Sequence, residues 1–252
     1  MNRLHVDIVG KGPDLVMLHG WAMHSGIWGS VREQLARHYR LHLVDLPGHG
    51  QSPAWESYSF EEIVASVAEI LPAESIVCGW SLGGQVAIKL ALSVPQQVSK
   101  LILVATTPCF VKRDDWRWGM DEPTLQLFME NLQRHYAQTL NRFFTLQVNG
   151  SRDMTNVLAQ LRNQLSQYKQ PDSDALRAGL QILLTNDLRE KLADVSQPVW
   201  LLHGENDVIT HVDAARWMHR HLPHAKFIGF PHCGHAPFLS YPDQFVANLY
   251  DL

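Results

Sequence analysis

The chain has 252 residues, of which 46% are hydrophobic and 18% are charged, and its formal net charge is −4. This length suits one α/β or barrel domain, and this balance excludes disordered, collagen-like and coiled-coil chains. The net negative charge argues against nucleic-acid binding, and the longest apolar runs are too short to span a bilayer. Three scattered cysteines (Cys78, Cys109 and Cys233) and an N-terminus without a readable signal peptide favour a reducing cytoplasm.

The predicted strands are short β-branched or leucine-rich runs, at residues 4–9, 15–18, 41–44, 75–78, 101–104, 199–202 and 227–230. Helices are expected between them. One begins at Ser59, where Glu62 completes a capping box, and another covers residues 82–94 and stops before Pro95. Alternating strands and helices predict an α/β fold with a mostly parallel sheet and helices on both faces.

The alternation stops between about residues 110 and 190, where no convincing strand is visible. Helical patterns cover residues 123–136, 139–148, 155–168 and 173–185 instead. A segment of this length without strands favours a helical lid over a few extra surface helices. We therefore expect a core made of residues 1–110 and 187–252 and an inserted lid made of residues 111–186.

The strongest functional pattern is Gly79-Trp80-Ser81-Leu82-Gly83, which has the spacing of a nucleophile elbow. In such a turn the serine sits between a strand and a helix in a strained conformation, and the flanking glycines remove side chains that would clash. A predicted strand precedes Ser81 and a predicted helix follows it. The alternative is a simple serine cap at a helix start, but this context favours Ser81 as a catalytic nucleophile.

A serine hydroxyl needs a base, and 14 histidines compete for that role. His235 follows the last predicted strand, and a histidine late in the chain fits the order serine, acid, histidine of α/β-hydrolases. His232, three residues earlier, is its rival. His203 follows a strand, and the remaining C-terminal candidates read as surface or loop residues: His211, His219, His221 and His224. The last three fit no common zinc pattern, so no metal is expected.

The orienting acid is expected at Asp207, just past the strand at residues 199–202. The carboxyl ends of parallel strands share one rim of the sheet, so Asp207 and Ser81 are expected on the same rim. Glu205 and Asp213 are weaker candidates. Two backbone N–H groups are needed for the oxyanion, and we assign them to Leu82, directly after the serine, and to Trp21 in the segment Leu18-His19-Gly20-Trp21.

These segments, together with Asp45-Leu46-Pro47-Gly48-His49-Gly50, resemble an α/β-hydrolase along the whole chain. Within that superfamily the sequence resembles the pimeloyl-[acyl-carrier protein] methyl ester esterases of biotin synthesis. The resembling segments include Arg142-Phe143 followed by Leu146-Gln147. The more selective features are Trp80 before the serine and Ala236-Pro237-Phe238 after the histidine. The resemblance implies that substrate contacts fall on Trp21, Ser81, Leu82, Phe143, Phe144, Thr145, Leu146, Gln147 and His235.

The resemblance also implies that a four-helix lid meets acyl carrier protein through basic side chains. The charges agree: residues 131–170 carry Arg134, Arg142, Arg152, Arg162 and Lys169 against one acid, Asp153. This segment has a net charge of +4 in a chain of −4, an asymmetry that suits an acidic partner better than an ordinary solvated face. The expected carrier contacts are Arg134, Arg142, Arg152 and Arg162. Gln138 stands where the resemblance leads us to expect a further arginine.

The sequence thus predicts a monomeric cytoplasmic serine esterase that acts on pimeloyl-[acyl-carrier protein] methyl ester and needs no cofactor. Two alternatives remain. One is a broader hydrolase, such as a short-chain carboxylesterase or a carbon–carbon bond hydrolase. The other is a non-catalytic ligand sensor on the same scaffold.

Overall fold

The computed structural model describes residues 3–166 and 168–250. One seven-stranded sheet, in the order β1-β3-β2-β4-β5-β6-β7, forms its centre. Only β1 pairs antiparallel, with β3, and every other neighbouring pair is parallel. The strands are β1 (Val6–Val9), β2 (Asp14–Leu18), β3 (Arg40–Val44), β4 (Ser75–Trp80), β5 (Val98–Val104), β6 (Val199–Gly204) and β7 (Ala225–Phe230).

The helices follow the predicted alternation with the strands. They are η1 (Ser25–Trp28), α1 (Gly29–Leu35), α2 (Phe60–Ala68), α3 (Leu82–Ser93), α4 (Glu122–Arg134), α5 (Tyr136–Val148), α6 (Met154–Leu165), α7 (Ser173–Thr185), η2 (Arg189–Asp194), α8 (Val212–His221), α9 (Pro237–Ser240) and α10 (Pro242–Tyr250). The capping box predicted at the start of α2 is present, with Ser59 and Glu62 bonded reciprocally.

Each face of the sheet is covered by its own hydrophobic layer. Val77 and Leu103 point to one face, where α2, α3 and α8 pack, and Cys78 and Ile102 point to the other, where α1, α9 and α10 pack. All six residues of β4 are buried, which explains why this strand has no polar alternation. These layers confirm the predicted α/β fold with helices on both faces.

The strand ends differ from the prediction where pairing extends beyond the apolar run. β4 continues through Gly79 and Trp80 because these residues pair with Leu103 and Val104 of β5. β5 begins three residues earlier than expected, at Val98, whereas residues 4 and 5 lie outside β1.

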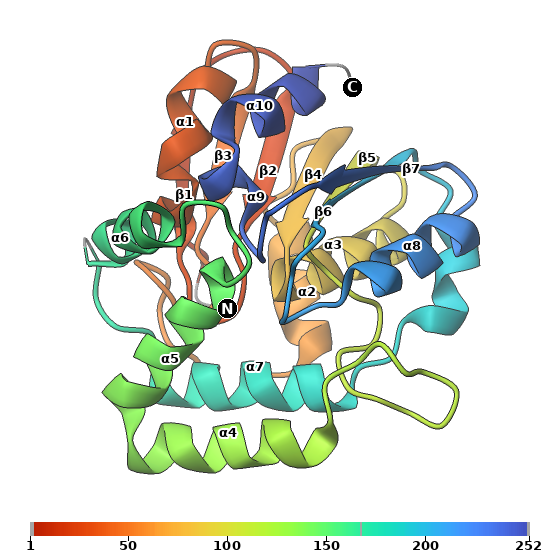
Figure 1. Cartoon of the computed structure of the whole chain (residues 1–252). Coiled ribbons are helices and arrows are strands. Elements are labelled where there is room, and N and C mark those ends of the chain that lie inside the picture. The colour runs from red at the N-terminus through yellow and green to blue at the C-terminus, as the bar shows by residue number, and fades with distance from the viewer. Residues whose placement is uncertain (1–2, 167, 251–252) are drawn as a thin grey trace.

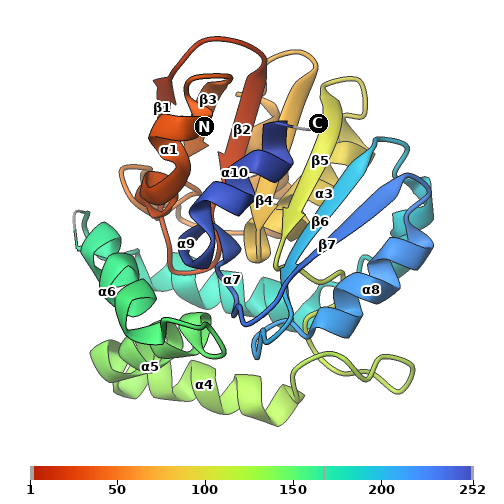
Figure 2. The same ribbon diagram turned by 45° about the horizontal axis from the view of Figure 1, so that its top comes forward.

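Helices α4–α7 form an insertion between β5 and β6, at the edge of the sheet where the parallel strands end (Figure 1; Figure 2). Their predicted limits need correction. α4 ends at Arg134 and α5 starts at Tyr136, because His135 leaves the helical conformation, with a φ of −138°. α6 ends at Leu165 rather than residue 168. The division into a core and a lid stays a prediction.

No helix in the described ranges, residues 3–166 and 168–250, combines the length and the apolar character needed to cross a membrane.

The N-terminal turn of α3 packs against the end of β2 at Gly83. A Cβ atom on Gly83 would lie 2.5 Å from the carbonyl oxygens of both Leu18 and His19. Helix and strand can therefore approach this closely only if residue 83 has no side chain.

Gly83→Ala should lower the free energy of unfolding by about 1–3 kcal/mol, because the new methyl group meets two backbone oxygens that cannot move away. Gly29→Ala is the matched control. Gly29 has helical backbone angles, and its Cβ would meet only the flexible Gln164 side chain, at 3.2 Å. That variant should stay within about 0.5 kcal/mol of the parent. Urea denaturation measures both, and equal stability of the two variants would contradict this account of α3 packing.

Candidate active site

Ser81 connects β4 to α3 in a strained backbone conformation, with φ 55° and ψ −118°. Its own N–H donates to the Val104 carbonyl oxygen at 3.0 Å, and its carbonyl oxygen accepts from Thr106 Oγ1 at 2.7 Å. These bonds fix a geometry that costs about 1–3 kcal/mol in a non-glycine residue. A side chain on Gly79 would overlap the Gly83 backbone. The predicted turn is therefore present, with the serine at its tip.

The Trp21 segment lies beside Ser81. A Cβ atom on Gly20, the residue before Trp21, would be only 3.2 Å from Ser81 Cβ. The buried His19 ring fixes this segment. Its Nδ1 donates to the Gly20 carbonyl at 2.8 Å, and its Nε2 accepts from the Leu46 N–H at 2.9 Å. Burial lowers the pKa of His19 well below its ordinary value, which keeps the ring neutral and able to accept. The Trp21 indole is anchored in turn by a 2.8 Å bond to the Leu176 carbonyl.

Leu82 is the first residue of α3, so its N–H belongs to a helix N-terminus that has no intrahelical acceptor. The Trp21 segment and this helix start therefore flank Ser81, as the sequence predicted. Their role in holding an oxyanion stays a prediction.

The two loops that follow β6 and β7 bring Asp207 and His235 together. His235 Nδ1 donates to Asp207 Oδ2 at 2.7 Å, and both side chains are fully buried. The Asn206 N–H donates to the Cys233 carbonyl at 2.9 Å, which ties one loop to the other. The His235 backbone is held by bonds to the Gln147 carbonyl and from the Trp80 indole, each 2.8 Å long.

Burial alone would raise the pKa of Asp207, but the His235 ring beside it, its hydrogen bond to the carboxylate and the nearby His203 ring move that pKa well below its usual range. Asp207 is therefore a stable anion that fixes the proton of His235 on Nδ1. The other ring nitrogen, His235 Nε2, is buried and has no hydrogen-bond partner among the described residues, Ser81 included. It is an unused acceptor in the resting site.

The rival candidates lie elsewhere. His232 is exposed, and its carbonyl oxygen accepts from the Arg152 N–H. Glu205 is exposed, and Asp213 pairs with Arg216 at 2.8 Å on the surface of α8.

Ser81 opens into a small apolar cavity of about 100 Å³ between the sheet edge and the insertion. Of the residues expected to contact substrate, Trp21, Phe143 and Leu146 line it, and the Phe143 ring packs edge-on against Trp21 with centroids 4.9 Å apart. The sequence did not single out the remaining lining residues, which are Phe110, Met120, Thr124, Leu125, Phe128, Leu180, Leu183 and Ile209.

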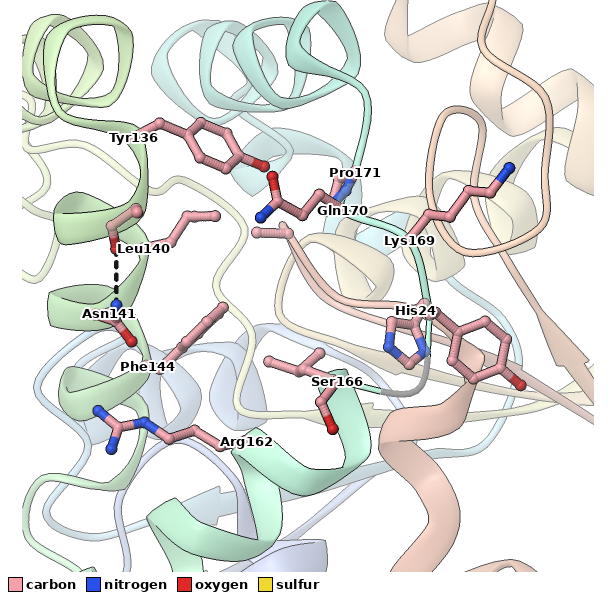
Figure 3. A pocket seen from close by; sticks show the side chains of 14 residues that line it. His24, Tyr136, Leu140, Asn141, Phe144, Arg162, Ser166, Lys169, Gln170 and Pro171 are labelled. Carbon is pink, nitrogen blue, oxygen red and sulfur yellow. Dashed lines mark hydrogen bonds between the residues drawn. The ribbon is translucent and has the colours of Figure 1, made fainter.

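The predicted contact stretch 143–147 does not face one space. Phe143 and Leu146 are three residues apart and share a helix face, whereas their neighbours point elsewhere. Phe144 lines a separate pocket of about 400 Å³, together with Tyr136 and Arg162 (Figure 3). The Thr145 hydroxyl donates to the Asn141 carbonyl on the exposed side, and Gln147 contributes its backbone to His235.

The four arginines expected to contact a carrier are all exposed on the insertion. Arg134 ends α4 and lies 3.9 Å from Glu130. Arg142 lies on α5, Arg152 precedes α6, and Arg162 lies on α6.

Asp207→Asn should destabilise the fold by about 1–3 kcal/mol, because the new amide places an N–H₂ group among N–H and O–H donors. The pH dependence follows from the depressed pKa of Asp207. The stabilisation by the carboxylate is fully present above the unfolded-state pKa of about 3.9 and is lost as pH falls through the lower folded-state pKa. The stability difference between parent and variant, from urea denaturation, should be constant above about pH 5 and shrink only below about pH 4. A difference that already shrinks near neutral pH would contradict a stable Asp207 anion.

The sequence pattern of the Alpha/beta hydrolase family matches residues 15–248. The chain is 59% identical to a protein of Nitrosomonas europaea named pimeloyl-[acyl-carrier protein] methyl ester esterase, over 98% of each chain. A protein of Nitrosospira multiformis with the same name is 54% identical, over 98% of this chain and 96% of its own.

Solved structures are similar along nearly the whole chain. The esterase EaEST from Exiguobacterium antarcticum has a TM-score of 0.91 at 24% identity, covering 98% of this chain and 94% of its own. The enol-lactonase from Burkholderia xenovorans LB400 has a TM-score of 0.86 at 18% identity, covering 98% and 95%. These two show the fold alone. From the family pattern and the two named relatives, the chain belongs to the alpha/beta hydrolase family and, within it, to the pimeloyl-[acyl-carrier protein] methyl ester esterases.

Proposed function

We propose that this protein is a serine carboxylesterase that hydrolyses the methyl ester of pimeloyl-[acyl-carrier protein] to pimeloyl-[acyl-carrier protein] and methanol in biotin biosynthesis. Two relatives that are 59% and 54% identical over almost the full chain carry the name of this activity. The observation within the molecule that carries the proposal is the buried Asp207–His235 bond with its unused Nε2 acceptor. The indole of Trp80, the residue before Ser81, bonds the His235 carbonyl and so ties this pair to the serine turn.

The reaction begins when Ser81 Oγ attacks the ester carbonyl and His235 Nε2 takes its proton. Catalytic hydrogen bonds of this kind commonly form only once substrate is bound, so the Ser81 hydroxyl turns toward Nε2 in the substrate complex. Asp207 stabilises the imidazolium, and the Leu82 and Trp21 N–H groups bind the oxyanion. His235 then protonates the leaving methanol. Water, activated by the same base, hydrolyses the acyl-enzyme and frees Ser81.

The cavity explains why a methyl ester is the reacting end. Its walls are apolar, and an unpaired carboxylate would lose its hydration there, whereas a neutral ester would not. A product that carries a free carboxylate leaves for the same reason. The cavity volume of about 100 Å³ equals only a few water molecules, so the acyl chain enters when the lid, residues 111–186, moves away from the core formed by residues 1–110 and 187–252.

The exposed arginines of the lid, Arg134, Arg142, Arg152 and Arg162, form the docking surface for acyl carrier protein in this proposal. Residues 131–170 carry a net charge of +4, and exposed positive charge of this kind attracts an acidic partner before contact. We also propose that the enzyme is monomeric and cytoplasmic and that it requires no cofactor, because the reaction needs only the side chains and N–H groups named above.

Ser81→Ala should lower kcat by about 10⁴–10⁶ without loss of fold, since the members of a triad act as one unit. His235→Ala should cost a similar factor, and the matched control His232→Ala should retain nearly full activity. Steady-state hydrolysis of the carrier-linked ester measures all three, with circular dichroism to check folding. A Ser81→Ala enzyme that keeps a tenth of the parental turnover would exclude this mechanism, and the reverse order for the two histidines would transfer the base to His232.

Reversing Arg142 and Arg162 to Glu should raise KM for the carrier-linked ester about tenfold, since each exposed contact contributes about 0.5–1 kcal/mol and the new charges repel the carrier. Hydrolysis of a small methyl ester should stay nearly unchanged. High salt should weaken the parental preference for the carrier substrate, because it screens exposed charges. The control is Arg220→Glu, an exposed arginine in the last turn of α8 that lies outside residues 111–186. Equal losses on both substrates would mean that the two arginines stabilise the lid instead.

A substrate panel tests the proposed function as a whole. The carrier-linked methyl ester should have the highest kcat/KM, above unlinked methyl esters of short acids and above a carbon–carbon bond substrate such as a β-diketone. A higher value for an unlinked ester would make the protein a general carboxylesterase.

A further inference from the structure

The Asp207 carboxylate accepts hydrogen bonds from four donors, and two of them belong to Thr210. Oδ1 accepts from the N–H groups of Ile209 at 2.8 Å and Thr210 at 3.0 Å. Oδ2 accepts from the Thr210 hydroxyl at 2.8 Å, beside the 2.7 Å bond from His235 Nδ1. The Thr210 hydroxyl also lies 3.1 Å from the Ala105 carbonyl, but its single proton serves the shorter contact, to the carboxylate.

Thr210 is fixed in turn by a second buried histidine. His203 lies at the end of β6, is 1% exposed, and donates from Nε2 to the Thr210 carbonyl at 2.7 Å. The same nitrogen lies 3.4 Å from Asp207 Oδ2. Three polar side chains, those of His203, Asp207 and Thr210, are therefore buried together behind His235, where each would be costly without its partners.

We infer that Thr210 and His203 are positioning residues, which hold the Asp207 carboxylate in the orientation that His235 requires; this inference rests on the proposed catalytic role of that pair. The reason lies in the geometry. Rotation about the Cβ–Cγ bond moves both carboxylate oxygens together, so the two backbone N–H groups on Oδ1 and the donors on Oδ2 limit the same motion. The Thr210 hydroxyl holds Oδ2 next to His235 Nδ1, and His203 holds the Thr210 backbone that delivers both contacts.

Thr210→Val tests the hydroxyl, because it keeps the shape of the side chain and the backbone N–H but removes the O–H donor. Loss of a hydrogen bond to a charged group should lower kcat for methyl hexanoate about tenfold to a hundredfold. KM should stay within about twofold, since no substrate contact changes. Thr210→Ser restores the donor and should recover most of kcat. Thr185→Val is the matched control, because that hydroxyl bonds the Gln181 carbonyl on the exposed side of α7.

His203→Phe tests the support, because it removes the donor to Thr210 and keeps a buried ring. The kcat of His203→Phe should also be lower than that of the parent, as for Thr210→Val. The kcat of the double variant His203→Phe with Thr210→Val should lie within about twofold of the kcat of the slower single variant. The two losses should not multiply, because both changes release the same carboxylate. Thr210→Ala repeats the comparison if the valine variant does not fold.

A second readout is the rate at which a fluorophosphonate probe labels Ser81, which needs His235 and Asp207 but no natural substrate. The order parent, Thr210→Ser, then Thr210→Val supports the inference even if the carrier-linked ester proves not to be the substrate. The inference is wrong if Thr210→Val keeps both rates within twofold, or if Thr210→Ser loses as much as Thr210→Val. A parent protein that neither turns over esters nor reacts with the probe would overturn the proposed function, and this inference with it.

Discussion

The site depends on the contact between two loops that leave neighbouring strands. Gly204 ends β6, and a side chain there would overlap the backbone of Gly234 in the loop after β7. With glycine at position 204 the loops come close enough for the Asn206 N–H to bond the Cys233 carbonyl and for Asp207 to bond His235. Gly234 meets a different neighbour, because a Cβ atom there would lie 2.5 Å from the Asn149 carbonyl oxygen. Because β6 and β7 are parallel and adjacent, the sheet delivers both loops to one edge. The order of the strands and the close approach of the Gly204 and Gly234 backbones together place Asp207 beside His235.

The serine reaches the same edge at the cost of backbone strain. Its positive φ is compatible with the fold because the carbonyl of Val104, the last residue of β5, and the hydroxyl of Thr106, two residues further on, hold the turn. Gly83 then lets α3 begin directly against β2, which brings the Trp21 segment beside Ser81. The destabilising features of the molecule, a strained turn and a buried anion, are therefore concentrated at the sheet edge, and the two apolar layers on the sheet provide the opposing stabilisation.

The sequence alone predicts those features of the fold and the site that depend on local residue patterns. Buried strands show as apolar runs, Ser59 and Glu62 show a helix start, and glycines two residues either side of Ser81 show a strained turn. The partners of Asp207 were not predictable, because a threonine three residues after an acid is common in turns and only tertiary packing shows that Thr210 and His203 are buried around it. The sequence likewise does not show that the stretch 143–147 faces two spaces, because helical rotation directs Phe143 and Phe144 to different pockets.

The central claim is that the site cleaves the far ester of an acyl chain that stays attached to its carrier. Mass spectrometry of acyl carrier protein bearing a pimeloyl methyl ester, after incubation with the enzyme, tests this claim most directly. The account predicts that the carrier loses one methyl group as methanol and keeps the pimeloyl chain. Loss of the whole acyl chain, through cleavage of its link to the carrier, or an unchanged carrier mass would contradict it.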